Sequence, residues 1–258
     1  MTTTTRSLQN ITVELCVGGI DDVLLAASRS IDRIELNCGM AVGGLTPTSA
    51  LAAAARTIFS GPIIAIVRPR EGGFVYSDAE FRLMLQEGES LLEKGIDGLA
   101  LGFLTQSNQV DVARCAEFRR TFPNVTLVFH KAFDFVPDRK IALPQLIACG
   151  FNRILTSGGA KTAVEGATAL SCLRQLAGDQ IEILPGGGIR ADNVASLIRA
   201  TGIQQIHLAA REIASEFTSG STSMGLGLPG CDDFYHGRTS QQKLDELLQA
   251  IEYSDLTL

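Results

Sequence analysis

The chain has 258 residues, of which 45% are hydrophobic and 26 are glycine, so it carries enough apolar material for one large core. Its formal net charge of −6 gives no basic surface for binding phosphates, so we expect neither nucleic acid nor a membrane as a partner. We expect a cytoplasmic protein, because the first residues are polar, no run reaches the roughly 20 apolar residues that span a bilayer, and the six cysteines include no CxxC pair.

Short apolar or β-branched runs recur along the chain, and a helical pattern follows each of them. Eight runs predict strands, at residues 12–17, 33–38, 63–70, 98–104, 126–133, 153–159, 181–188 and 205–210. Eight strands that alternate with helices in about 250 residues predict an α/β fold, a single (β/α)₈ TIM-like barrel, with a doubly wound sheet as the alternative. We expect a polar N-terminal tail at 1–11, the barrel at 12–211, and a C-terminal loop and helix that pack on the barrel at 212–258.

Several of the helices between these strands have recognisable ends. Thr46 followed by Pro47 predicts an N-cap and a first helical position. The sequence SDAE from Ser77 predicts a capping box, and Gly95 is typical of the end of the same helix. Pro144 lies inside a further helical pattern, where it predicts a kink or a later start.

Strand parity separates the barrel interior from the helix layer, because alternate residues face opposite sides. If the apolar residues face the helices, the polar residues face inward. With Asp134 just past its strand, the inward polar set includes Glu14, Cys16, Arg33, Glu35, Asn37, Arg68, His130 and His207. Charges near the C-terminal ends of barrel strands usually form a site, so we expect Glu14, Glu35, Arg68, His130 and His207 to converge in one pocket there. The alternative is an internal network of Glu14 and Glu35 with Arg68 that only fills the barrel.

The loops after the strands indicate a site for an anion. Two arginines, a Gly-Gly turn and two aromatic residues follow the third strand, and glycine-rich turns follow the sixth and seventh. Small residues at such turns let backbone N–H groups approach an anion. We therefore expect an anion between Arg68 and the backbone of Gly187 and Gly188. The expected ligand-binding residues are Arg68, Arg70, Tyr76, Asp78, Ser157, Gly187 and Gly188.

A series of motifs between about residues 12 and 211 resembles the CutC family of copper homeostasis proteins. The series reads VELCV, RIEL, GGLTP, RPR with GGFVYSD, FHKAFD, LTSGG, PGGGI and IHLAA. The resemblance implies a TIM-like barrel and cytoplasmic copper handling, with two cysteines near the ends of the first two strands as Cu(I) ligands. Cys16 matches the first of these cysteines, whereas Asn37 stands at the second. Cys38, one residue later, faces the helices by parity unless a bulge re-aims it.

Three functions remain open at this point. The first is binding of a copper ion by Cys16, with His207 or His130 as a partner, since thiolates and Cu(I) are both soft. The second is general acid/base catalysis on a small phosphate- or carboxylate-bearing metabolite, in which the expected catalytic residues are Glu14, Glu35, His130, Asp134 and His207. The third is an oligomeric scaffold without a ligand. We expect a homo-oligomer.

Overall fold

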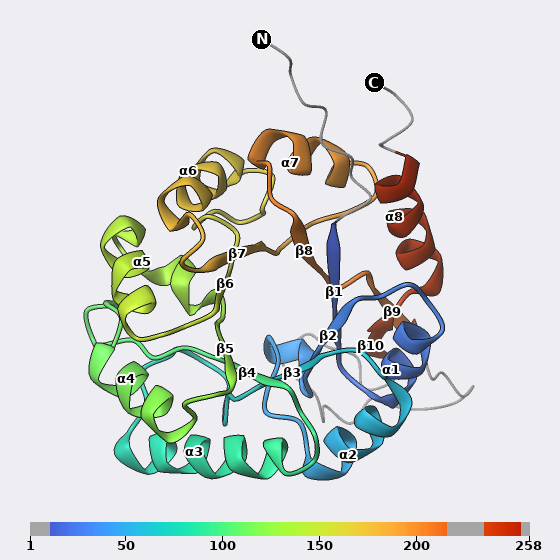
Figure 1. Ribbon diagram of the computed structural model, residues 1–258. Helices are drawn as coiled ribbons and strands as arrows, with labels where there is room; N and C mark the ends of the chain where they lie inside the picture. The colour runs from blue at the N-terminus through green and yellow to red at the C-terminus, as the bar shows by residue number, and fades with distance from the viewer. Residues whose placement is uncertain (1–10, 216–234, 254–258) are drawn as a thin grey trace.

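The computed structural model describes residues 11–215 and 235–253. Eight parallel strands form one sheet in the order β7-β6-β5-β4-β3-β2-β1-β8. Their bounds are β1 (Thr12–Val17), β2 (Arg33–Leu36), β3 (Ile63–Ile66), β4 (Gly98–Leu101), β5 (Thr126–Phe129), β6 (Arg153–Thr156), β7 (Glu182–Pro185) and β8 (Gln205–Leu208). An isolated bridge between Gly186 and His207 joins the two ends of the sheet, so the barrel is nearly closed (Figure 1). The predicted TIM-like barrel is confirmed.

Helices surround the strands on the outside (Figure 1). They are α1 (Ile20–Ala27), α2 (Ser49–Ile58), α3 (Asp78–Leu92), α4 (Val112–Thr121), α5 (Arg139–Ala148), α6 (Ala167–Ala177), α7 (Val194–Thr201) and α8 (Gln241–Tyr253), with short 3₁₀ turns η2 (Met40–Val42) and η3 (Lys131–Phe135). No helix within the described ranges is long and apolar enough to cross a membrane.

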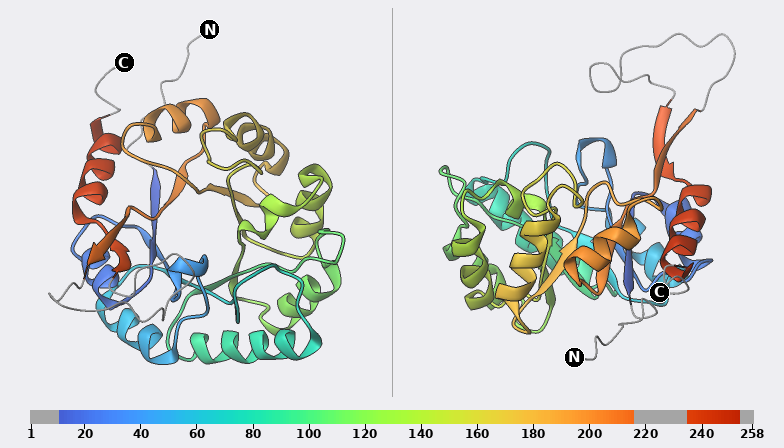
Figure 2. Two further views of the ribbon diagram at one scale, coloured as in Figure 1. Left: turned by 180° about the vertical axis from the view of Figure 1, so that it is seen from behind. Right: turned by 90° about the horizontal axis from the view of Figure 1, so that it is seen from above.

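The C-terminal part of the described chain adds a hairpin and the last helix. Strands β9 (Arg211–Ser215) and β10 (Tyr235–Thr239) pair antiparallel, and the hairpin rises from the end of the barrel at which the strands end (Figure 2). Helix α8 follows it and is tied to the turn after α1 by an ion pair of 2.6 Å between Arg29 and Asp245. Most of the expected N-terminal tail and the middle of the expected C-terminal loop, at 216–234, lie outside the described residues.

Two expectations about helix ends hold in the structure. The capping box is confirmed, because Ser77 Oγ accepts from the Glu80 amide and a Glu80 carboxylate oxygen accepts from the Ser77 amide at 2.6 Å. Gly95 follows α3 with a left-handed φ of +83°, which favours glycine. Pro144 lies inside α5, which begins at Arg139, so it does not delay the start of the helix.

The predicted N-cap at Thr46 is wrong by two residues. Helix α2 starts after Thr48, whose hydroxyl oxygen accepts from the Leu51 amide at 3.2 Å. The Thr46 hydroxyl oxygen instead accepts from the Arg68 amide at 2.9 Å, and the hydroxyl donates to a Glu87 carboxylate oxygen at 2.7 Å. Tertiary partners therefore take Thr46 away from the helix end.

The interior of the barrel is divided into an apolar and a polar part. Along β3–β7 it is filled by a small cluster of Ile64, Ala100, Val128, Leu155 and Leu184. Between the strands and the helices lies a larger apolar layer that includes Leu15, Ile34 and Leu36, each fully buried. Along β1, β2 and β8 the inward residues are polar, as parity predicts. The candidate site therefore lies on this polar side of the barrel interior.

Candidate functional site

A buried ion pair joins β1 to β8. Glu14 and His207 are register partners, and His207 Nδ1 lies 2.7 Å from Glu14 Oε1. The other Glu14 oxygen accepts from Arg33 Nε. Burial alone would raise the pKa of Glu14, but the hydrogen bond and charge of His207, with the charges of Arg33 and Arg153, lower it to about 2. Burial would likewise lower the pKa of His207, but Glu35 and Glu14 raise it. Glu14 is therefore a carboxylate held between the Arg33 guanidinium and the His207 imidazole.

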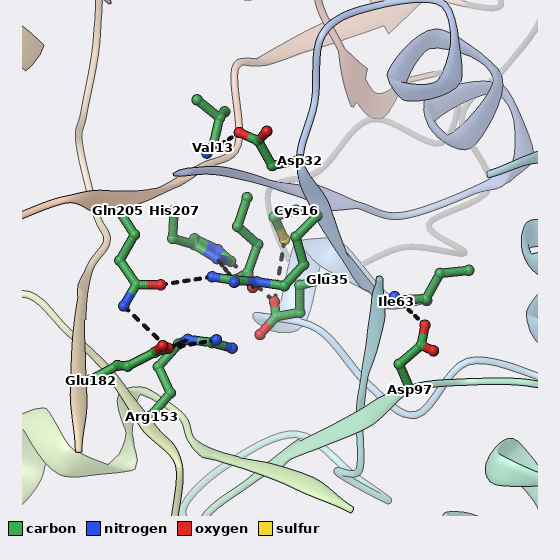
Figure 3. A network of polar contacts seen from close by, with 12 residues as sticks. Val13, Cys16, Asp32, Glu35, Ile63, Asp97, Arg153, Glu182, Gln205 and His207 are labelled. Carbon is green, nitrogen blue, oxygen red and sulfur yellow. Dashed lines mark hydrogen bonds and ion pairs between the residues drawn. The ribbon is translucent and has the colours of Figure 1, made fainter. Parts of the chain in front are cut away.

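From this pair a chain of polar contacts runs towards the N-terminal end of the barrel. Arg33 donates to Gln205 Oε1 at 2.9 Å, and the Gln205 amide donates to Glu182 at 3.3 Å. Arg153 forms an ion pair of 2.6 Å with the same Glu182 carboxylate (Figure 3). Each buried arginine in this chain of contacts thus faces a carboxylate of opposite charge, Glu14 for Arg33 and Glu182 for Arg153. An ion-pair network therefore does fill part of the barrel, with Arg33 rather than Arg68 as the cation beside Glu14.

Towards the C-terminal end, a thiol, a carboxylate and an imidazole come together. Cys16 Sγ lies 3.6 Å from Glu35 Oε2, and His207 Nε2 lies 3.9 Å from the same oxygen (Figure 3). The donor atoms of Cys16, Glu35 and His207 all lie within 4.8 Å of one another. The Asn37 amide donates to both Cys16 Sγ and Glu35 Oε2, at 3.3 Å and 3.1 Å. These three donor atoms are close enough to hold one metal ion.

The charges around the cluster determine its protonation. Burial and the charges of Glu35 and Glu14 raise the pKa of the Cys16 thiol well above its ordinary value. Burial and Glu14 also raise the pKa of Glu35. Without a metal, the thiol is therefore protonated and adds no further negative charge to the site.

A second sulfur atom lies beside Cys16, and sequence reasoning missed it. Met40, in η2, has its Sδ 3.9 Å from Cys16 Sγ. Cys38 lies in the same loop but faces elsewhere: it forms a bridge with Leu45, and its thiol donates to the Thr46 carbonyl at 3.0 Å. Cys38 lies beyond the end of β2 at Leu36, so its orientation is set by this loop. Met40 lies in a turn without periodicity, so no pattern in the sequence marked it.

Arg68 is buried and forms hydrogen bonds with the loops that follow β2 and β3. Its guanidinium donates to the carbonyls of Val42, Gly44 and Gly72 at 2.8–2.9 Å and lies over the Phe74 ring, 5.5 Å from the centroid. These contacts orient the guanidinium towards backbone carbonyls. The expected anion site of Arg68 with Gly187 and Gly188 stays a prediction, and in the structure the guanidinium donates to these loop carbonyls.

The other three residues of the loop after β3 also have structural partners. Arg70 forms an ion pair with Glu80 and lies over the Tyr76 ring, 5.0 Å from the centroid. Tyr76 is buried, which raises the pKa of its hydroxyl to about 12. Asp78 begins α3 and accepts from Arg114 at 2.8 Å, with its side chain largely exposed. These contacts fix the loop to α3.

His130 occupies a different part of the barrel mouth from His207. Its Nδ1 accepts from the Ala132 amide at 3.2 Å, and its ring lies 4.8 Å from the Phe74 ring. Burial and the charge of Arg68 lower its pKa to about 3. His130 and Arg68 thus meet around Phe74, while Glu14, Glu35 and His207 come from β1, β2 and β8. Among the described residues, no hydrogen bond or ion pair joins the two groups, so the expected single pocket stays a prediction.

Asp134 and Ser157 connect η3 to the loop after β6. Asp134 accepts hydrogen bonds from the Thr156 hydroxyl, the Ser157 amide and hydroxyl, and the Gly159 amide. The Lys131 ammonium lies 3.7 Å from the same carboxylate. Because its carboxylate accepts all these hydrogen bonds, Asp134 holds the loop after β6 in place.

A cavity of about 620 Å³ opens next to the thiol cluster. Its wall includes Cys16, Met40, Lys131, Gly187, Gly188, Arg190, His207, Arg211 and Lys243. Gly187 and Gly188 have left-handed φ angles of +107° and +68°, and a Cβ at Gly188 would lie 2.9 Å from Thr162. The glycine turn therefore brings backbone to the cavity wall, together with basic side chains other than Arg68.

The fold and this cluster define the class of the protein: a TIM-like barrel with sulfur, carboxylate and imidazole donors at its mouth. The model of the CutC family matches residues 11–212, and the chain belongs to this family. It is 41% identical over 203 residues to a family protein CutC of Treponema denticola, covering 79% of this chain and 82% of that protein. It is 35% identical to a family protein CutC of Chromobacterium violaceum, covering 93% and 98%.

Solved structures agree with this assignment. A CutC from Streptococcus agalactiae, named for copper homeostasis, superposes with a TM-score of 0.73 at 34% identity and covers 76% of this chain and 97% of that one. A phosphoribosylanthranilate isomerase from Thermotoga maritima superposes with a TM-score of 0.52 at 12% identity, covering 94% and 98%. The second similarity shows the barrel fold alone.

Proposed function

We propose that this protein binds Cu(I) through Cys16 and His207, and that it does so in the cytoplasm as part of copper homeostasis. The observation that supports this most directly is the convergence of the donor atoms of Cys16, Glu35 and His207 within 4.8 Å of one another. A thiolate is a soft ligand that suits Cu(I), and imidazole suits copper as well. The copper homeostasis name of the Streptococcus agalactiae relative points the same way.

The residues behind the cluster suit a metal-binding histidine. Such a histidine commonly donates its other ring N–H to a carboxylate, which fixes the ring and its tautomer. His207 has this arrangement, since Nδ1 contacts Glu14 and Nε2 faces Glu35. Copper would replace the thiol proton of Cys16, and the nearby carboxylates would favour the added positive charge.

A competition titration with a Cu(I) chelator, in reducing and oxygen-free buffer, tests the proposal. Substitution of a residue that only hydrogen-bonds to a metal ligand already costs about 10- to 100-fold in metal affinity, so we expect Cys16→Ser to weaken Cu(I) binding by more than about 100-fold. Cys115→Ser is the matched control, because it removes a buried thiol from α4. Unchanged affinity in Cys16→Ser would contradict the proposal.

The cavity supports a second candidate function, catalysis on a small anionic metabolite. Two neighbouring carboxylates have pKa values shifted in opposite directions, down for Glu14 and up for Glu35, which is the arrangement expected of an acid and a base. Lys131 and Lys243 on the cavity wall would attract the anion. Millimolar phosphate should then raise the melting temperature, and Lys131→Ala should reduce that rise. No rise with phosphate would count against this function.

A further inference from the structure

We infer that Met40 is a second sulfur ligand of the Cu(I) ion, beside Cys16. The inference rests on the proposed function and adds a ligand outside the cysteine, carboxylate and histidine cluster. Cys16 Sγ and Met40 Sδ lie 3.9 Å apart, and both residues line the same cavity. Two metal–sulfur bonds of about 2.3 Å, the length found for zinc and cysteine, span up to about 4.6 Å, which exceeds the distance between these two sulfurs.

The turn that carries Met40 is shaped for this approach. Gly39 and Gly43 flank η2 with left-handed φ angles of +59° and +90°, which favour glycine. Gly18 supplies the space, because a Cβ there would lie 2.5 Å from Met40 Cγ. A residue with any side chain at position 18 would thus force Met40 to shift.

Arg68 holds this turn in place by hydrogen bonds to its backbone. Its guanidinium donates to the carbonyls of Val42 and Gly44, which stand two and four residues after Met40 in the chain. Buried hydrogen bonds from a charged donor are among the stronger ones in proteins. Arg68 is therefore a positioning residue for Met40, a role that its contacts support better than anion binding.

The chemistry of the resulting set favours Cu(I). Thiolate and thioether sulfurs are soft donors that select Cu(I), whereas carboxylate oxygens suit harder ions. With Met40 the cavity wall carries two sulfurs and the His207 imidazole. The competing explanation is that Met40 merely packs over Gly18, since methionine often fills irregular gaps.

Two substitutions separate ligation from packing. Met40→Leu keeps the volume and removes the sulfur, and we expect it to weaken Cu(I) binding by about 10- to 100-fold in the chelator competition. Gly18→Ala keeps the sulfur but displaces it, so we expect a loss in the same direction. Gly19→Ala is the matched control for it, because nothing lies within 4 Å of a Cβ there, and we expect no change.

A spectroscopic measurement reads the bond directly. In selenomethionine-labelled protein loaded with Cu(I), selenium-edge X-ray absorption should show a copper neighbour, and Met40→Leu should remove it. If Cys16→Ser abolishes binding while Met40→Leu retains full affinity and no copper–selenium contact is seen, Met40 is not a ligand and the proposed function stands. If both variants retain full affinity, the copper site itself is wrong.

Discussion

Buried His130 should make the stability of this protein fall in mildly acidic solution. Burial and the charge of Arg68 lower its pKa from the ordinary 6.5 to about 3, so it stays neutral in the folded protein. In the unfolded chain the same imidazole takes up a proton near pH 6.5. Because the folded pKa is the lower one, the contribution of His130 to stability is complete above pH 6.5. It is lost progressively as the pH falls towards 3.

The size of this loss follows from the two pKa values. Each pH unit between them corresponds to about 1.4 kcal/mol. At pH 5 the loss should be about 2 kcal/mol, and over the whole interval down to pH 3 it should approach about 5 kcal/mol.

His130→Asn removes the titration and keeps a side-chain acceptor for the Ala132 amide. Urea unfolding of both proteins at pH 7 and pH 5 gives the free energy of unfolding. We expect the parent to lose about 2 kcal/mol more than the variant between these pH values. Other titrating groups are common to both proteins and cancel. An equal loss in the two proteins would refute the reasoning, whatever the variant's stability at pH 7.

Three further predictions concern the polar interior. We expect Cys38→Ser to leave Cu(I) affinity unchanged in the chelator competition, because its thiol faces a backbone carbonyl; a large loss would make it a ligand. Asn37→Cys should tighten Cu(I) binding in reducing buffer, since the Asn37 amide lies 3.3 Å from the Cys16 sulfur, and weaker binding would speak against that placement. Glu14→Gln should lower the free energy of unfolding by about 3–5 kcal/mol in urea titrations, because it leaves the buried Arg33 without its carboxylate; a loss below about 1 kcal/mol would show that the pair adds little.

The barrel and the inward-facing residues of β1, β2 and β8 could be predicted from the sequence. Side-chain direction along a strand is a local property. The outward direction of Leu15 therefore set the inward direction of Glu14, and that of Ile34 set the inward direction of Glu35. The spacing of eight strands and helices then determined the fold.

The meeting of particular residues could not be predicted in the same way. Parity gives the inner face of a strand but not the position of that strand around the barrel, so His130 and His207 were expected together although their strands lie apart. The partners of Arg68 are backbone carbonyls of two loops, which leave no mark in a sequence pattern. Met40 reaches Cys16 only through the turn after β2, whose path depends on those same hydrogen bonds.

Binding of Cu(I) at Cys16 is tested most directly by a crystal structure of the Cu(I)-loaded protein, with anomalous scattering recorded on both sides of the copper absorption edge. We expect one copper peak between Cys16 Sγ and the His207 imidazole, on the side of Met40. A peak at Cys38, or stoichiometric copper with no peak at Cys16, would contradict the proposed site.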